Sequence, residues 1–499
     1  MDIILKNLPI LVVITPLMMS LVVAVFSSYK ISWIISCVTT FLTFCFSVGL
    51  FLELKNVDLI SYHLGNWIPP FGIEYVIDKV SIIPVLIISS ISFIATIFSV
   101  KYFENEISID LIPKTYCLWL LAIAGLIGLV TTADVFNLFV FLEISSLSSV
   151  ALVAMGNKMD KKALPAAYNY LIIGAIGATF YVIGVGLLYS ITGTLNMGDL
   201  SIKLPELGVN KVVIAGFGFM IAGMMVKAAI FPLHIWLPSA YAFAPSPVSV
   251  LLAATATKAS IYIIARISYT IFGGTFELYA IDELKFFFIL LSIFAMFAGT
   301  FMAIYEKDIK RLLAHSSVAQ IGYIFLGISL ATSTGIASGF IHLVNHALIK
   351  AGLFMSVVAM GFYLQKRITI YSLSGIGKQM PITFFSFIIC GLSLAGLPLT
   401  AGFISKLYLV KAAYASEGIW LCFLILLSSV LSLIYLWKMI EALWFNKSVN
   451  KDEKVKEIPE IYIPLLFIAF LNIYFGIDAT IITESSFNAA ESLLKGVNK

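Results

Sequence analysis

A few charged residues lie deep inside apolar stretches of this sequence, and their types could carry protons. Glu143 stands in the middle of NLFVFLEISSLSSVALVAM, and Lys227, Lys258, Lys350 and Lys406 each lie well within an apolar run. A charged side chain at the centre of a membrane helix costs about 2.5–3.5 kcal/mol on the insertion scale. These five groups must therefore face one another or water rather than lipid.

Histidines accompany two of these lysines at helical spacing. His342, His346 and Lys350 follow one another at i, i+4 and i+8, which places them on one stripe of a helix. Lys227 and His234 are seven residues apart and share a face in the same way. Histidine changes charge near neutral pH, and burial can bring the pKa of a lysine down by several units. A single buried histidine is ordinarily a core residue, but this clustering predicts a proton relay.

Other charged residues near the spans are weaker candidates. Arg266, Lys411 and Lys438 lie towards the ends of apolar runs, where we expect the long side chains to reach the interface. Asp134, His234 and Arg266 are kept as secondary relay candidates.

The composition requires elements that cross a membrane. Hydrophobic residues make up 61% of the 499 residues, charged residues 12%, and the mean hydropathy is +1.03, whereas a soluble domain carries about 25% charged residues. The five cysteines fall within apolar runs without metal-ligand spacing, so we expect small buried hydrophobes. No nucleotide-binding motif is present, so we expect no cofactor and no metal, and the net charge of +4 does not point to nucleic acid.

Apolar runs predict an all-α polytopic protein with about fourteen transmembrane helices. The first is expected to be a retained helix, and the polar stretches NVDLISYHLGNWIPPFGIEY and NKSVNKDEKVKE are expected to be ordinary loops. The predicted helices lie near residues 8–26, 31–53, 78–100, 113–130, 134–156, 165–191, 211–235, 245–272, 284–304, 316–332, 335–363, 381–414, 419–445 and 459–482.

The distribution of basic residues predicts the orientation of the chain. With these spans, one set of alternate loops holds sixteen lysines and arginines, and the other set, which includes both termini, holds eight. Loops rich in lysine and arginine face the cytoplasm. We therefore expect both termini to be non-cytoplasmic.

Two predicted spans carry helix breakers beside a buried lysine. Pro232 follows Lys227 in KAAIFPLHIWLP, and Gly396 and Pro398 precede Lys406 in GLSLAGLPLTAGFISKLYL. A proline removes a backbone hydrogen bond, which is tolerated at membrane depth only where protein or water satisfies the freed groups. Broken spans in matching halves are typical of transporters built from inverted repeats.

Several motifs resemble a known family. The stretches FLEISSLSS, KAAIFPLHIWLP, APSPVSVLLAATATK, DIKRLLAHSSVAQIGY, HALIKAGLF and GLPLTAGFISK resemble signatures of the proton-conducting antiporter-like subunits, between about residues 100 and 415. This family includes the large membrane-arm subunits of respiratory complex I and the two large subunits of Mrp-type cation/proton antiporters. The chain length and the run GTLNMGDLS most resemble the D subunit of the Mrp antiporters.

The resemblance implies roles for the buried charges. Glu143 matches the family's carboxylate on the fifth helix, and Lys227 matches its partner on the broken seventh helix. In the family this pair opens and closes to admit protons to a chain of lysines, histidines and water. The sequence departs from the family's common WLPDAH at WLPSAYAF, where Ser239 and Tyr241 remove an acid and a histidine. We therefore expect no proton-carrying role for that loop.

The rest of the chain of groups follows in the same way. Lys258 matches the relay position on the eighth helix, His346 and Lys350 match the central relay on the eleventh, and Lys406 matches the exit group on the broken twelfth. The resemblance also implies two inverted five-helix repeats with broken helices 7 and 12. The expected parts are N-terminal helices in 1–112, repeats in 113–272 and 284–445, and a cytoplasmic loop with the last helix in 446–499.

The expected function is proton translocation within a multisubunit sodium/proton antiporter of a prokaryotic cell (inner) membrane. The alternative is a proton-pumping subunit of a complex I-like NADH:quinone oxidoreductase or a membrane hydrogenase, so the chain alone does not decide whether it serves an enzyme. A membrane scaffold or a polyprenyl- or acyl-handling enzyme is a third class, but it leaves the charge stripe beside broken helices unexplained. Expected partners are homologous and small hydrophobic membrane subunits, protons, sodium ions and the lipid bilayer, with no nucleic acid.

Overall fold

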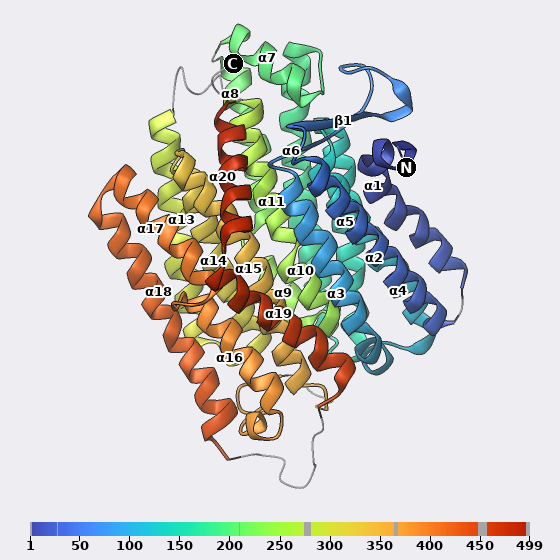
Figure 1. The fold of residues 1–499 in the computed structure, drawn as a ribbon, viewed down its shortest axis with the longest axis vertical. Coiled ribbons are helices and arrows are strands. Elements are labelled where there is room, and N and C mark those ends of the chain that lie inside the picture. Colours follow the sequence, from blue (N-terminus) through green and yellow to red (C-terminus); the bar gives the residue numbers. More distant parts are fainter. Residues whose placement is uncertain are drawn as a thin grey trace.

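The computed structural model describes residues 2–26, 28–208, 210–273, 281–363, 368–447 and 457–495, which form a bundle of long helices (Figure 1). Within these ranges, 13 helices are long and apolar enough to cross a membrane. The pair α16 (Pro381–Ala395) and α17 (Ala401–Glu417) adds a further span in two pieces. The chain is thus a nearly all-helical, multi-pass membrane protein, as predicted.

The N-terminal part contains three spans and a hairpin. Its helices are α1 (Asp2–Val25), α2 (Tyr29–Glu53) and α3 (Ile82–Glu106). Between α2 and α3 lie two short antiparallel strands, β1 (Leu59–His63) and β2 (Glu74–Asp78), paired from Leu59 with Asp78 to His63 with Glu74. The hairpin replaces a predicted ordinary loop. Its sequence signal is the alternation in β2, where Tyr75 and Ile77 are buried.

The middle part of the chain carries the first of the broken spans. Its helices are α4 (Ile112–Thr131), α5 (Val135–Ala154), α6 (Ala163–Thr192), α7 (Met197–Leu207), α8 (Lys211–Ala228), α9 (Trp236–Phe243), α10 (Ser246–Ala254) and α11 (Ala256–Ala265). The short helix α7 was not predicted, although Asn196 is an ordinary N-cap that accepts from the Asp199 N–H at 3.1 Å.

The C-terminal part completes the bundle. Its remaining helices are α13 (Ile281–Tyr305), α14 (Ile309–Ser329), α15 (Ser333–Met360), α18 (Ile419–Ile440), α19 (Pro459–Ile477) and α20 (Thr480–Lys495). The predicted last helix, 459–482, is in fact α19 followed by α20 after a bend at Asp478. The start of α1 and the end of α20 lie at the same end of the bundle (Figure 1).

Both predicted breaks are present, and a third accompanies them. In the seventh span α8 ends at Ala228, and α9 begins only at Trp236. The twelfth span is interrupted between α16 and α17. The eighth span is also interrupted, at Thr255, which has φ −123° and ψ −54°. The Thr255 hydroxyl donates to the carbonyl of Leu251 at 2.7 Å, a bond that bends helices.

Helix α14 begins earlier than the predicted range 316–332, because Asp308 caps it by accepting from the Arg311 N–H at 2.9 Å. Lys310 and Arg311, counted above as loop residues, therefore lie in its first turn, and Lys310 is buried. The expectation of buried cysteines holds for Cys390 and Cys422, whereas Cys45 is exposed. Some loop residues counted for orientation lie outside the described residues: Lys366, Arg367, Lys451, Lys454, Lys456 and Lys499.

Three central spans are buried on nearly all sides: α10 with α11, α14, and α15. They carry Lys258, His342, His346 and Lys350, all at most 2% exposed. The outer helices α1, α2 and α18 instead expose apolar side chains, including Leu21, as expected where lipid or another subunit covers the bundle. The bundle therefore places these four predicted relay residues in its buried centre.

Candidate functional site

The first predicted pair, Glu143 and Lys227, lies on neighbouring helices but is not closed. The Lys227 ammonium donates to the Ser146 hydroxyl at 2.8 Å, one turn beyond Glu143 on α5. Among the described residues no carboxylate lies within 4.0 Å of the Lys227 Nζ. Glu143 is nonetheless the charged group that acts on Lys227, and its buried Oε1 has no protein partner among those residues. The two charges are therefore not in direct contact, and a serine holds the ammonium.

The local backbone explains how Lys227 reaches this place. It lies in the last turn of α8, and the next residue but one, Ala229, has a left-handed φ of 56° that ends the helix. The indole N–H of Trp236 donates at 2.9 Å to the carbonyl of Val226, which also accepts from the Ala229 N–H. On the facing helix, a Cβ at Gly174 would come within 3.2 Å of the ammonium. Glycine there makes room for the lysine head.

Lys258 begins the central group. It lies just after the break at Thr255, and its ammonium donates to the carbonyl of Ala253, which the break leaves available. The Thr257 hydroxyl lies 3.5 Å from the same Nζ. Lys258 is fully buried. Its contacts among the described residues are to neutral oxygens, which accept from an ammonium without fixing it by an opposite charge.

The predicted stripe on α15 is present. His342 contacts the Ser405 hydroxyl through Nδ1 at 2.8 Å and the Gln320 side-chain oxygen through Nε2 at 2.9 Å. Its ring stacks on that of His346, with centroids 6.1 Å apart and planes 6° from parallel. Further along, Lys350 donates to the Leu313 carbonyl at 2.8 Å and to the Ser316 hydroxyl.

His346 stands at the centre of this group without a hydrogen-bond partner. Neither ring nitrogen makes a hydrogen bond to another described residue, although the side chain is fully buried. The charged groups that act on it are Lys258 and Lys350. Buried polar groups are nearly always hydrogen-bonded, to protein or to ordered water. A polar site between two lysines and a second histidine therefore suits water molecules that bridge them.

Lys406 ends the line at the second broken span. Its ammonium donates to the carbonyls of Leu394 at 3.0 Å and Ala395 at 3.1 Å, at the end of α16. These are orphan carbonyls of a helix C-terminus, where a cation is favourable. The preceding residue, Ser405, is the one bonded to His342. Lys406 is thus the chain neighbour of the serine that contacts His342 on α15.

The structure consequently groups five of the predicted residues, while Glu143 and Lys227 form the other predicted site. Lys258, His342, His346, Lys350 and Lys406 form one cluster across α11, α15 and α17, linked by ring stacking, serine contacts and mutual charge. In contrast, within the part of the chain that is described, no direct hydrogen bond joins Lys227 to Lys258.

Two secondary candidates are explained locally. Asp134 caps α5 and accepts from the N–H groups of Phe136 at 2.9 Å and Asn137 at 2.6 Å, so its carboxylate has a structural task. His234 lies in the break between α8 and α9 and stacks on Phe231 with centroids 5.3 Å apart. The backbone of Pro232, two residues before it in the same break, also interacts with the ring.

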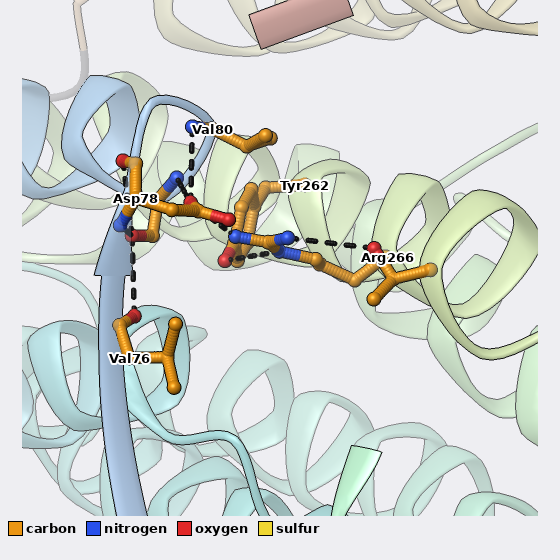
Figure 2. Close-up of polar contacts among 7 residues, drawn as sticks. Val76, Asp78, Val80, Tyr262 and Arg266 are labelled. Atoms are coloured by element: carbon orange, nitrogen blue, oxygen red, sulfur yellow. Dashed lines mark hydrogen bonds and ion pairs between the residues drawn. The ribbon is translucent and has the colours of Figure 1, made fainter. Parts of the chain in front are cut away.

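Arg266 was expected to extend to the membrane interface, but its side chain is buried inside the protein. Its guanidinium forms a buried ion pair with Asp78, and its Nε donates to the Tyr262 hydroxyl at 2.7 Å (Figure 2). Both charged residues are at most 8% exposed. The Asp78 carboxylate also accepts from the Val80 N–H at 3.0 Å (Figure 2). Arg266, the residue that directly follows α11, therefore ties the end of this helix to the end of the hairpin.

Uncharged partners are what the sequence analysis missed. Gln320, Ser405, Ser316 and Ser146 hold the histidines and lysines in place. Gln320 lies in DIKRLLAHSSVAQIGY and Ser405 in GLPLTAGFISK, directly beside Lys406. A serine or glutamine in an apolar span carries little signal by itself, because serine can bond its own helix backbone.

Comparison with known proteins identifies the family of the chain. The family described as "NADH:quinone oxidoreductase/Mrp antiporter, TM" matches residues 132–432. The N subunit of NADH-quinone oxidoreductase from Desulforudis audaxviator is 37% identical over 440 residues, which cover 87% of this chain and 86% of the relative. The D subunit of the Na(+)/H(+) antiporter from Alkalihalophilus pseudofirmus is 30% identical over 460 residues, which cover 90% and 89%.

Solved structures share the whole fold. A chain of the membrane-bound sulfane sulfur reductase, an archaeal respiratory membrane complex, matches with a TM-score of 0.90 and 31% identity over 99% of both chains. A chain of the Mrp complex from Dietzia sp. DQ12-45-1b matches with a TM-score of 0.89 over 98% of both chains, at 23% identity, which shows the fold alone. The chain belongs to the NADH:quinone oxidoreductase/Mrp antiporter transmembrane family.

Proposed function

We propose that this chain is the proton-translocating subunit of a multisubunit monovalent cation (sodium)/proton antiporter. The groups that carry protons are Glu143, Lys227, Lys258, His342, His346, Lys350 and Lys406. The relative named as the D subunit of a Na(+)/H(+) antiporter supports the class of transporter. The buried, mutually close lysines and histidines support the path.

One observation carries this proposal. His346 is fully buried, has no partner among the described residues at either ring nitrogen, and lies among Lys258, Lys350 and His342. A histidine kept only for packing would have its nitrogens bonded or be replaced by an apolar residue, because an unsatisfied buried polar group costs about 1–3 kcal/mol. A histidine that takes and gives protons through water needs this freedom.

The first break supplies a gate for the path. Two acceptors on α5 act on the Lys227 ammonium. It contacts the Ser146 hydroxyl, and the Glu143 carboxylate acts on it electrostatically. Movement of Lys227 between them changes which protonation state is favoured, since an ion pair stabilises the charged forms. The state with Lys227 on Ser146 is the open one.

A second candidate function has its own support. The relative named as the N subunit of NADH-quinone oxidoreductase is 37% identical over most of this chain. In that case the same residues would move protons in a complex I-like or membrane hydrogenase complex, driven by electron transfer in other subunits. The proton path is common to both candidates.

Partners and placement follow from the first candidate. We infer homologous and small hydrophobic neighbouring subunits in a prokaryotic cell (inner) membrane, with both termini outside the cytoplasm. Helices α2 and α18 expose apolar side chains that such neighbours could cover. We also infer that residues 113–272 and 284–445 are the inverted repeats, since the fourth span of each range is broken beside a lysine, and the first range carries a further break at Thr255.

Copurification tests the class of complex. The tagged chain is purified from its host in mild detergent, and the accompanying proteins are identified by mass spectrometry. The antiporter proposal expects small hydrophobic subunits and a larger homologue. Peripheral subunits with flavin or iron–sulfur centres in equal amounts would contradict it and favour the second candidate.

A further inference from the structure

A polar cavity of about 580 Å³ lies at the end of the bundle opposite the two termini. Its walls come from the end of α3, the loop before α6, the start of α10, the first turn of α14 and the end of α15. The charged residues on its walls are Glu106, Lys158, Asp160, Asp308 and Lys310, and two tyrosines, Tyr102 and Tyr363, complete the titratable groups. None of these residues belongs to the relay described above.

A carboxylate and an ammonium meet at one serine in this cavity. The Glu106 carboxylate accepts from the Ser246 N–H at 2.6 Å and from the Ser246 hydroxyl at 2.5 Å. The Lys310 ammonium lies 3.5 Å from the same hydroxyl and donates to the Ala244 carbonyl at 3.2 Å. Ser246 is the first residue of α10, so an acid caps this helix and offsets the unfavourable placing of a cation there.

The two charges do not form a direct ion pair. No carboxylate oxygen of a described residue lies within 4.0 Å of the Lys310 Nζ, and its contacts at 3.2–3.5 Å are with neutral oxygens. A purely structural pair gains most from close, bidentate contact in a dry site. A hydroxyl between acid and amine, beside a cavity large enough for water, is instead suited to proton exchange.

Polar groups lead from Lys310 towards Lys258. The Ser249 hydroxyl lies 3.4 Å from the Lys310 Nζ and donates to the Tyr241 carbonyl at 2.7 Å. The Tyr241 hydroxyl donates to the Leu252 carbonyl at 3.0 Å and also interacts with the Thr257 side chain, and Thr257 contacts Lys258. Tyr241, for which no proton-carrying role was expected, lies in α9 and contacts both ends of this route, Ser249 through its backbone carbonyl and Thr257 through its hydroxyl.

We propose that this cavity is the mouth through which protons enter from the loop side to reach Lys258, with Glu106 and Lys310 as the groups that admit them. Glu106 takes a proton from water in the cavity, and the Ser246 hydroxyl connects it with Lys310. The Ser249, Tyr241 and Thr257 hydroxyls lie along α10 between Lys310 and Lys258, and water molecules join them into a path to the break at Thr255. The proposal rests on the relay role of Lys258 and adds its water-facing end.

Chemical labelling tests the mouth independently of transport. Ala242 lines the cavity and is half-buried, so Ala242→Cys is treated with a membrane-impermeant cationic thiosulfonate in vesicles of each orientation. Mass spectrometry of the peptide that contains residue 242 distinguishes its label from any label on the native cysteines, so these need not be replaced. We expect labelling from one side only, the side of the loop that precedes α14. Glu206→Cys, exposed on α7 at the other end, should be labelled from the opposite side.

Proton movement in the same vesicles tests the role. Labelling of Ala242→Cys, and the variants Glu106→Gln and Lys310→Met, should each slow proton movement by about tenfold or more. Lys114→Ala, an exposed lysine at the same end, should leave it unchanged. The melting temperature of each purified complex shows whether a variant folds.

Two driving forces separate this proposal from the proposed function. Proton movement is driven by a sodium gradient and, separately, by an electron donor. If the unlabelled wild type moves protons with the electron donor but not with the sodium gradient, the antiporter assignment is contradicted. The effect of labelling on proton movement driven by the electron donor then still tests the mouth. Failure of Ala242→Cys to react from either side, or normal rates in both Glu106→Gln and Lys310→Met, would overturn the mouth.

Discussion

Two of the three broken spans, the seventh and the twelfth, hold their buried lysines in different ways. At the first break Lys227 lies at the end of α8 and bonds a side chain of another helix, Ser146, within reach of a carboxylate. At the second break Lys406 lies in the second half-helix, α17, and reaches back to two backbone carbonyls of α16. In both places the ammonium lies near the C-terminal end of a half-helix, where backbone dipoles favour a cation.

This difference assigns different tasks to the two lysines. The partners of Lys227 are side chains, which can change rotamer and position, so this site can switch between serine and carboxylate. The partners of Lys406 are backbone carbonyls fixed by the end of α16, so this lysine can gain or lose a proton but has little reason to move. The first break is therefore a gate and the second an exit.

Removal of the Glu143 carboxylate should have the largest effect on transport, because it abolishes the difference between the two breaks. Glu143→Ala takes away the acceptor that makes the first site switchable, so proton movement should fall by about 100-fold or more, while insertion into the membrane is unchanged or easier. Cation-driven pH change in vesicles measures this effect. Glu206→Ala, which removes an exposed acid on α7, is the matched control. Normal transport by Glu143→Ala would contradict the gate.

Stability should then distinguish the two lysines. Lys227→Met and Lys406→Met should both impair transport, but Lys406→Met also leaves two buried carbonyls without a charged donor. Hydrogen bonds to charged groups contribute about 1.5–3 kcal/mol, so Lys406→Met should lower the melting temperature more than Lys227→Met does, for which only the Ser146 hydroxyl is orphaned. Thermal unfolding of the purified complexes checks this order. Equal losses would mean that the two breaks are held alike.

The Asp78–Arg266 pair provides a reference for an ion pair without a transport task. Burial raises the pKa of the Asp78 carboxyl, whereas the Arg266 guanidinium and the N–H groups of Ser81 and Val80 lower it. The lowering effects together are larger, so the pKa lies below the ordinary 3.8. A carboxyl with a depressed pKa stabilises the fold above its unfolded pKa, and this stabilisation disappears as the pH falls through the folded pKa.

Asp78→Asn should therefore destabilise the protein above about pH 4, and the difference from the wild type should shrink as the pH falls below that value towards the folded pKa of Asp78, with little direct effect on proton movement. Unfolding temperatures between pH 3 and pH 7 measure this convergence. Asp58→Asn removes the exposed partner of Lys79 and should have a smaller effect at every pH, because exposed pairs contribute little. A pH-independent loss in Asp78→Asn would show that the carboxylate charge is not what stabilises the hairpin.

Hydropathy and helix breakers predict much of the fold, and charge in apolar runs predicts much of the site. The spans and the breaks beside Lys227 and Lys406 follow from apolar length, proline and glycine. The break at Thr255 has neither breaker, and a threonine bonded to its own helix gives little sequence signal. The burial of Lys310 was missed because a basic pair resembles a loop, although Asp308 before it is an ordinary helix cap.

Long-range partners are beyond the reach of a single sequence. Arg266 lies near the end of its span, which favours an interfacial position, yet Asp78 from the hairpin binds it inside the protein. The pairing depends on how β2 is placed against α11, which no local pattern specifies. The same holds for Gln320 and Ser405, which meet at His342 from two other helices.

The most direct test of a proton path through the bundle is His346→Leu, measured for both thermal stability and proton movement. His346 makes no hydrogen bond to described protein residues, so its loss should leave the melting temperature unchanged or higher while proton movement is abolished. Ser356→Ala, a buried change on the same helix that removes only a bond to the Gly352 carbonyl, should retain transport. Proton movement at the wild-type rate in His346→Leu would contradict the relay, whichever complex the chain serves.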